Sequence, residues 1–219
     1  METKNYISDS IKGIERNDNK DRIFTTKWGE SLLSVLFDGI SSAPEANKGI
    51  DLAVDYIEKN YIKLSSLNIY NLSDMMFESN LIIAESNLDS PFTTYSAIYI
   101  SGKENLAVIS NLGDSRIYEI SPQYIKQLSE DDSLMHNKNV VTKYLGMLEL
   151  EREDFSDLQV DIKDKKMLLC SDGFYTILEK NLSRFHSILN FKNSLNIKKS
   201  LSAEIKNKNL DDSSYILIY

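Results

Sequence analysis

The sequence is poor in the residues that build disulfides, zinc sites and histidine-based catalytic centres. Its 219 residues include one cysteine and two histidines. A single cysteine excludes an intramolecular disulfide and a zinc site built on several cysteines. That cysteine, Cys170, lies within an apolar run, which indicates a small core residue rather than a nucleophile. Neither His136 nor His186 stands within a motif, so we expect no functional role for either.

Long hydrophobic runs and clusters of basic residues are also missing. No apolar run is long enough for a membrane-spanning helix, and the N-terminal segment has no apolar signal core. We therefore expect a cytoplasmic protein with no membrane partner. Lysine and arginine number 25 against 33 acidic residues, and the net charge is −8. This balance disfavours nucleic acid as a partner and is compatible with carboxylates that gather around cations.

Hydrophobic residues make up 42% of the chain, which is enough for a substantial core. Residues 5–26 are predicted to hold a first strand, a polar turn and a short second strand at 23–26. Further strands are predicted at 31–37, 94–100, 106–112, 116–120, 124–128, 160–162, 167–170 and 215–219, and helices at 44–64, 72–88 and 195–206. Ser73 is a plausible N-cap, and a short helix should follow Gly173. Most of the predicted strands follow one another directly along the chain. This order of elements favours an α+β fold with antiparallel sheets.

Several aspartates stand at the borders of the predicted strands. Asp38, Asp114 and Asp172 each follow an apolar run and adjoin a glycine, Asp211 precedes the last strand, and Asp21 lies in the early turn. Carboxylates that converge repel one another unless a cation lies between them. Oxygen ligands without histidine or cysteine suit Mg²⁺ or Mn²⁺. The alternative is turn chemistry, since Asp-Gly is a common hairpin signal.

An ordered series of motifs extends over most of the chain. The first is Gly13-x-x-Arg16-x-x-Asn19-x-Asp21. The others are, in order, VLFDGI, FTTYSAIYI, NLGDSR, QLSEDDS, VTKYLG, LLCSDGFYTIL and DDSSYILIY. Taken together, these motifs resemble those of the metal-dependent Ser/Thr protein phosphatases of type 2C, the PPM family, in its bacterial single-domain form.

The resemblance implies a single domain over residues 1–219, folded as a four-layer α/β/β/α sandwich of two antiparallel sheets flanked by helices. It also implies an enzyme that hydrolyses phosphoserine and phosphothreonine in phosphoproteins. In that family a water bridging two metal ions, Mn²⁺ or Mg²⁺, attacks the phosphorus in line. Phosphorylated proteins would be the partners, with a Ser/Thr kinase and its substrates as candidates. The sequence indicates no particular oligomeric state.

The resemblance also assigns metal ligands, position by position. Asp38 would bridge both metals, and the Gly39 carbonyl would bind one of them. Asp172 and Asp211 would bind the other ion. Asp114 matches a position associated with a third, weaker metal in bacterial members of the family.

Two further residues match the catalytic positions of the family. Asp21 would act through a metal-bound water. Arg16 would hold the substrate phosphate, a role that suits a planar guanidinium with paired donors.

The chain departs from the family pattern at several places. Lys20 stands where the family usually has Glu or Gln, and its cation would either weaken metal binding or point outward and contact substrate. Ser41 and Ser42 replace two glycines, and the flap segment between about 134 and 141 is shortened. These departures favour an alternative function: a catalytically weak or inactive homologue that serves as a phosphoprotein-binding or regulatory module. The intact Asp38, Asp172 and Asp211 favour an active enzyme.

Overall fold

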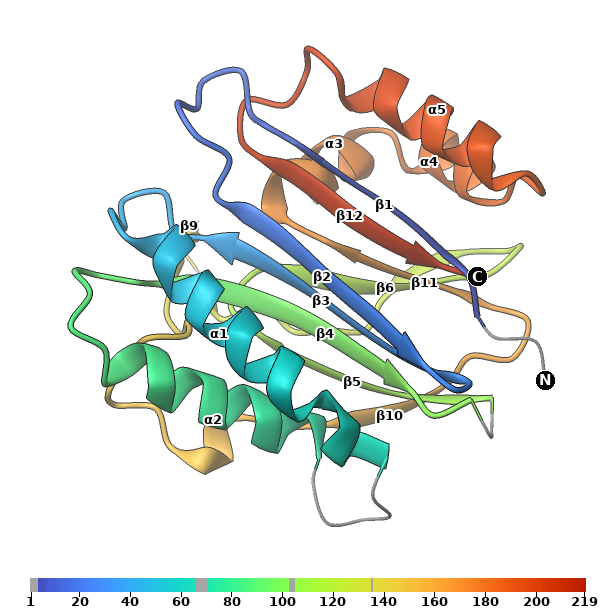
Figure 1. Ribbon diagram of the computed structural model, residues 1–219. Coiled ribbons are helices and arrows are strands. Elements are labelled where there is room, and N and C mark those ends of the chain that lie inside the picture. Colours follow the sequence, from blue (N-terminus) through green and yellow to red (C-terminus); the bar gives the residue numbers. More distant parts are fainter. Residues whose placement is uncertain (1–3, 66–70, 103–104, 135) are drawn as a thin grey trace.

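Two antiparallel sheets lie at the centre of the molecule (Figure 1). The computed structural model describes residues 4–65, 71–102, 105–134 and 136–219. One sheet has the strand order β1 (Tyr6–Ile11), β12 (Ser213–Ile218), β11 (Lys166–Cys170), β6 (Arg116–Ile120) and β7 (Ile125–Gln127). The other has the order β10 (Leu158–Asp161), β5 (Leu106–Leu112), β4 (Thr93–Ile100), β3 (Ser31–Gly39) and β2 (Asp21–Trp28). A small hairpin pairs β8 (Ser133–Leu134) with β9 (Asn137–Val141).

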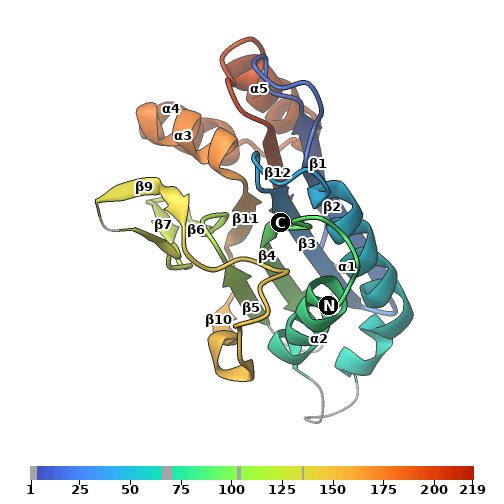
Figure 2. The ribbon, with the colours of Figure 1, turned by 90° about the vertical axis from the view of Figure 1, so that its left-hand side faces the viewer.

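Helices cover the outer faces of the two sheets (Figure 2). The β2–β3–β4 side carries α1 (Ala46–Asn60), its continuation η1 (Tyr61–Ser65) and α2 (Leu72–Ala84). The β11–β12 side carries α3 (Asp172–Lys180), α4 (Leu182–Leu189) and α5 (Ser194–Ile205). A short turn of 3₁₀ helix, η2 (Arg152–Asp154), precedes β10. The layers confirm the predicted α/β/β/α sandwich.

Strand β3 shows how the sequence specifies these layers. Its side chains alternate between the two faces of the sheet, as in any strand. Leu33 and Phe37 pack against α1 and α2, whereas Leu32 and Leu36 pack into the core between the two sheets. Because both faces are covered, the strand reads as one continuous apolar run instead of alternating with polar residues.

Several helix predictions need correction. The N-cap of α2 is Asn71 rather than Ser73, and the Asp74 carboxylate accepts a hydrogen bond from the Asn71 backbone N–H at 3.0 Å. His186 lies on α4, an amphipathic helix that the sequence analysis missed within a polar stretch. The segment between the predicted strands 94–100 and 106–112 lies partly outside the described residues. Among the helices that the structure describes, none combines the length and apolar character needed to cross a membrane.

One end of the sandwich collects the borders of five strands. Because neighbouring strands are antiparallel, the end of β3 lies beside the start of β2, and Asp38 is opposite Asp21 in the register. The end of β5, the end of β11 and the start of β12 reach the same end, which lies on the left in Figure 1 and faces the viewer in Figure 2. The hairpin of β8 and β9 also lies there. The predicted site residues are therefore gathered by the strand arrangement.

Candidate metal and phosphate site

Four aspartates from distant parts of the chain line a single cavity of about 220 Å³. They are Asp38, Asp114, Asp172 and Asp211. The rest of the lining consists of Ile40, Ser41, Ser42, Thr94 and Val141. Val141 belongs to β9, so the hairpin of β8 and β9 contributes to the wall of this cavity.

Local backbone structure places Asp38 and Asp172. Asp38 lies near the end of β3, and its carbonyl accepts a hydrogen bond from the Thr93 hydroxyl on β4 at 2.9 Å. Asp172 is the first residue of α3, two positions earlier than the predicted helix start after Gly173. A carboxylate in the first helical turn interacts favourably with the helix dipole. Both acids therefore sit on rigid elements.

A tight turn places Asp114. The preceding residue, Gly113, has a φ of +100°, and a Cβ there would come within 2.5 Å of Thr94. Glycine is therefore required at this position. The Asp132 carboxylate accepts a hydrogen bond from the Gly113 N–H at 3.0 Å, and the Asp132 N–H donates to the Gly113 carbonyl at 2.9 Å. The turn that carries Asp114 is thus held by the residue just before β8.

Asp21 is buried beside the cavity. It is the first residue of β2, opposite Asp38 on β3, and it is only 6% exposed. One carboxylate oxygen accepts a hydrogen bond from the Ser171 hydroxyl at 2.9 Å. The other, Oδ1, has no hydrogen-bond partner among the described residues. A buried acceptor without a partner costs free energy, which marks this oxygen as one that a ligand would satisfy.

The carboxylates of the site raise one another's pKa values. Burial raises the pKa of Asp38 well above its usual range, and the charges of Asp21 and Asp172 raise it further. Burial also raises the pKa of Asp172 to about 7, with added repulsion from Asp114. Burial raises the pKa of Asp21 to about 7 and that of Asp114 to about 6. The charged forms are disfavoured here, and nearby cations would stabilise them.

Arg16 and Asp211 contact each other directly. The Arg16 Nε donates to one carboxylate oxygen of Asp211 at 2.5 Å, and Nη2 donates to the other. Asp211 lines the acidic cavity, whereas Arg16 lines a neighbouring cavity of about 250 Å³ together with Gly39 and Lys20. The structure therefore brings a predicted metal ligand and the predicted phosphate ligand together, and it places Gly39 on the neighbouring cavity.

The donor set of the acidic cavity suits divalent cations. All of its charged side chains offer oxygen atoms, which are the ligands that Mg²⁺ and Mn²⁺ prefer. In the part of the chain that the structure describes, no three histidine, cysteine or acidic side chains already enclose an ion site. Both carboxylate oxygens of Asp211 accept hydrogen bonds from Arg16. The carboxylates fit the cations by charge and donor type, and Asp211 would have to exchange its partner.

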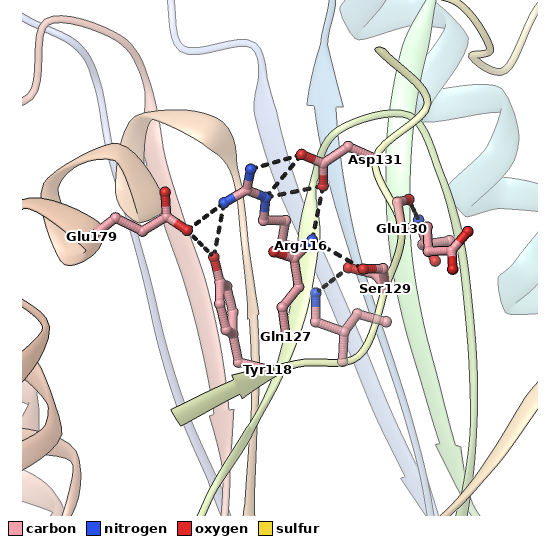
Figure 3. Close-up of polar contacts among 9 residues, drawn as sticks. Arg116, Tyr118, Gln127, Ser129, Glu130, Asp131 and Glu179 are labelled. Carbon is pink, nitrogen blue, oxygen red and sulfur yellow. Dashed lines mark hydrogen bonds and ion pairs between the residues drawn. The ribbon is translucent and has the colours of Figure 1, made fainter. Parts of the chain in front are cut away.

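Arg116, which the sequence analysis quoted only as part of a motif, is the centre of a second charged cluster (Figure 3). Its guanidinium donates to the Asp131 carboxylate at 2.7–3.1 Å and to the Glu179 carboxylate at 2.6 Å. It also donates to the Tyr118 hydroxyl at 3.1 Å and lies 3.7 Å from the centre of the Tyr175 ring. Because Tyr175 and Glu179 lie on α3, Arg116 connects β6 to the helix that begins at Asp172.

Sequence comparison relates the chain to bacterial phosphatases. No protein-family model matches the chain. "Serine/threonine phosphatase stp" of Listeria monocytogenes is 27% identical over 214 residues, which cover 85% of this chain and 83% of that protein. Its namesake in Listeria welshimeri has the same identity and coverage.

Solved structures share the fold. The Ser/Thr phosphatase of S. agalactiae superposes with a TM-score of 0.81 at 20% identity and covers 99% of both chains. RsbX, described in complex with magnesium, has a TM-score of 0.71 at 18% identity and covers 97% of this chain and 93% of its own. The catalytic domain of PstP, described with 2 manganese ions, has a TM-score of 0.73 at 19% identity, covering 98% and 97%. The motif series, the sequence relatives and the four-layer fold together make this chain similar to the bacterial phosphatases of type 2C, the PPM family.

Proposed function

We propose that this protein is a metal-dependent phosphatase of phosphoserine and phosphothreonine in proteins, and that residues 1–219 form its single catalytic domain. The observation that carries the proposal is the meeting of four acidic side chains, from four segments, in one cavity. The raised pKa values of three of them, Asp38, Asp114 and Asp172, show that their charged forms are disfavoured without cations nearby. The sequence relatives named Ser/Thr phosphatase support the substrate class.

Each part of the site has a role in the proposed reaction. Asp38, Asp172 and Asp211 would hold two Mn²⁺ or Mg²⁺ ions, with Gly39 as a backbone ligand and Asp114 as a ligand to a third, weaker one. Such ions lower the pKa of a water and offset negative charge on phosphoryl oxygens.

Arg16 would bind the substrate phosphate. Its guanidinium lies at the border between the two cavities, beside Asp211, and its paired donors match the geometry of phosphate oxygens. Asp21, buried opposite Asp38 in the strand register, would accept a hydrogen bond or proton from a water near the ions through its unpartnered Oδ1. A protein nucleophile is not required. Cys170 is fully buried, and burial raises the pKa of its thiol well above the usual value.

The test is hydrolysis of a phosphothreonine peptide with Mn²⁺ added, compared with the same assay in EDTA. We expect phosphate release that depends on the metal and increases with its concentration until the site is saturated. Release that persists in EDTA would contradict the proposed metal-dependent reaction. Circular dichroism on the same samples would verify that the protein is folded in both.

The second candidate function is a phosphoprotein-binding module without turnover. It is favoured by the pair of Arg16 and Asp211, because both carboxylate oxygens of Asp211 already accept hydrogen bonds from the arginine and a metal ion would have to replace that partner. A folded protein that binds a phosphothreonine peptide, and releases no phosphate over a wide range of Mn²⁺ concentrations, would establish this candidate and exclude the enzyme.

A further inference from the structure

Lys20 connects three segments beside the acidic cavity. Its ammonium group donates to the carbonyl of Ser41 and to the carbonyl of Ala43, both at 2.8 Å. Its backbone N–H donates to the Asp212 carboxylate at 2.8 Å, and its backbone carbonyl accepts from the Gly39 N–H at 3.1 Å. The residue therefore contacts the end of β3, the loop that follows β3, and the segment before β12.

The loop that Lys20 holds forms part of both cavities. Ser41 lines the acidic cavity on one side and the neighbouring cavity with Arg16 on the other. The loop has few other backbone bonds: the Ile40 N–H donates to the Phe92 carbonyl at 3.0 Å, and the Ala43 N–H donates to the Ile40 carbonyl at 2.9 Å. The position of this wall, next to Asp38, thus depends on a small number of contacts.

The direction of the Lys20 side chain differs from both expectations drawn from the sequence. Among the described residues, its ammonium group forms no ion pair with an acidic side chain, so it does not compete for the carboxylates of the cavity. It is directed at the backbone carbonyls of Ser41 and Ala43. Two carbonyl oxygens that face one point repel each other, and a cation between them removes that repulsion.

The two serines that replace glycines are compatible with this arrangement. The described residues with positive φ do not include Ser41 or Ser42, so the loop does not require glycine at either position. Gly39 is different, because a Cβ there would come within 2.9–3.0 Å of Lys20 and Ala46. The loop therefore follows an ordinary backbone path, close against Lys20.

We propose that Lys20 is a positioning residue, whose ammonium group fixes the loop of residues 40–43 so that Asp38 and Gly39 keep their place in the metal site. This inference rests on the proposed function, because it assumes that the cavity binds metal ions. The hydrogen bonds of Lys20 are observed independently of that assumption. It reverses the simple electrostatic expectation. An acid at position 20 would face the carbonyls of Ser41 and Ala43, displace the loop and weaken metal binding instead of strengthening it.

The test compares Lys20→Met, Lys20→Glu and Lys20→Arg with the natural protein, using Mn²⁺ binding by calorimetry without substrate. We expect Lys20→Met to raise the Kd for Mn²⁺ about tenfold or more, as loss of a residue supporting a metal ligand usually does. Lys20→Glu should raise it at least as much, and Lys20→Arg should restore most of the affinity. Lys27→Met is the matched control, since the Lys27 ammonium donates to the Lys4 carbonyl at 2.8 Å farther along β2.

A second readout needs neither metal nor turnover. In EDTA, Lys20→Met should increase amide hydrogen exchange at Ile40 and Ala43 and leave exchange in the core of β3 unchanged. Unchanged exchange at the two loop amides, or tighter Mn²⁺ binding by Lys20→Glu, would overturn the proposal, as would a natural protein that binds no Mn²⁺. Loss of Mn²⁺ affinity in Lys20→Met, in a protein that never releases phosphate, would support the positioning role and contradict the proposed enzyme.

Discussion

Two clusters of charged side chains lie close together in this molecule and differ in how their charges are satisfied. Asp114 and Arg116 stand two residues apart in one motif, yet they belong to different clusters. The Arg116 guanidinium has carboxylate and hydroxyl partners (Figure 3), and it also lies over the Tyr175 ring. The cavity next to it holds Asp38, Asp114 and Asp172, whose pKa values are all raised.

The difference separates a structural role from a functional one. Burial alone would lower the pKa of Arg116, but its hydrogen bonds to Asp131 and Tyr118 leave that pKa above the ordinary value. The charge of Arg116 is therefore balanced by groups of the protein itself. In the acidic cavity, burial and repulsion are not offset, and Asp21 keeps an oxygen without a partner. Buried groups that remain unsatisfied are the ones that point to a ligand.

The largest expected effect is on catalysis. Asp172→Asn keeps the shape of the side chain and removes one charge from the cavity. We expect it to lower metal-dependent phosphate release by about three orders of magnitude, because metal ions contribute several kcal/mol to the stabilisation of such a transition state. The same change should raise the melting temperature in EDTA, since it removes a source of repulsion. Assays of peptide hydrolysis and thermal unfolding measure the two effects.

The control for that variant is Asp51→Asn. Asp51 forms an exposed ion pair with Arg22 on the surface, and their side chains are 58% and 47% exposed. Its loss should change neither activity nor melting temperature measurably, as exposed pairs contribute little. An Asp172→Asn protein that retains activity would remove this residue from the metal site.

The next largest effect is on stability. Arg116→Met breaks a buried ion pair in which the side chains of Arg116 and Asp131 are 6% and 15% exposed. We expect a loss of about 3–5 kcal/mol in the free energy of unfolding, because Asp131 is left buried without its partner. Urea titration would measure it. Arg22→Met, which breaks an exposed pair, should lose less than about 1 kcal/mol. Equal losses in the two variants would contradict the contrast between the clusters.

Much of the fold and part of the site could be predicted from the sequence, because the information was local. The apolar run of β3 leads directly into Asp38-Gly39. In the same way, the apolar run of β11, which ends at Cys170, is followed closely by Asp172. The helix α4 was missed although Leu182, Phe185 and Leu189 recur at helical spacing, because polar residues around them resemble a loop.

Other features depend on distant segments and could not be predicted. The pair of Arg16 and Asp211 joins residues 195 positions apart, in two loops that meet only because β1 pairs with β12. The side chain of Lys20 is long and flexible, so its direction depends on the loop carbonyls that it contacts. The hairpin of β8 and β9 is short and lacks alternating hydrophobic residues, so no periodic pattern predicts it.

The smallest effect expected is the dependence of stability on pH. Burial raises the pKa of Asp21 and Asp172 to about 7, from the ordinary value near 4 that applies to the unfolded chain. Between these values the folded protein binds more protons than the unfolded chain, so its stability increases as the pH falls. In EDTA, the melting temperature should therefore rise as the pH is lowered from about 8 to about 6. The slope is at most about 1.4 kcal/mol per pH unit for each group.

Saturating Mn²⁺ should remove this rise, because bound cations stabilise the charged carboxylates, which then do not take up protons in this pH range. The metal should also stabilise the protein more at pH 8 than at pH 6, since protons and ions compete for the same oxygens. Asp172→Asn in EDTA should show a shallower slope than the natural protein, whereas Arg116→Met should keep the full slope around a lower melting temperature. If acidification lowered the melting temperature in EDTA, the acidic cavity would be as well satisfied as the Arg116 cluster, and the contrast between them would be wrong.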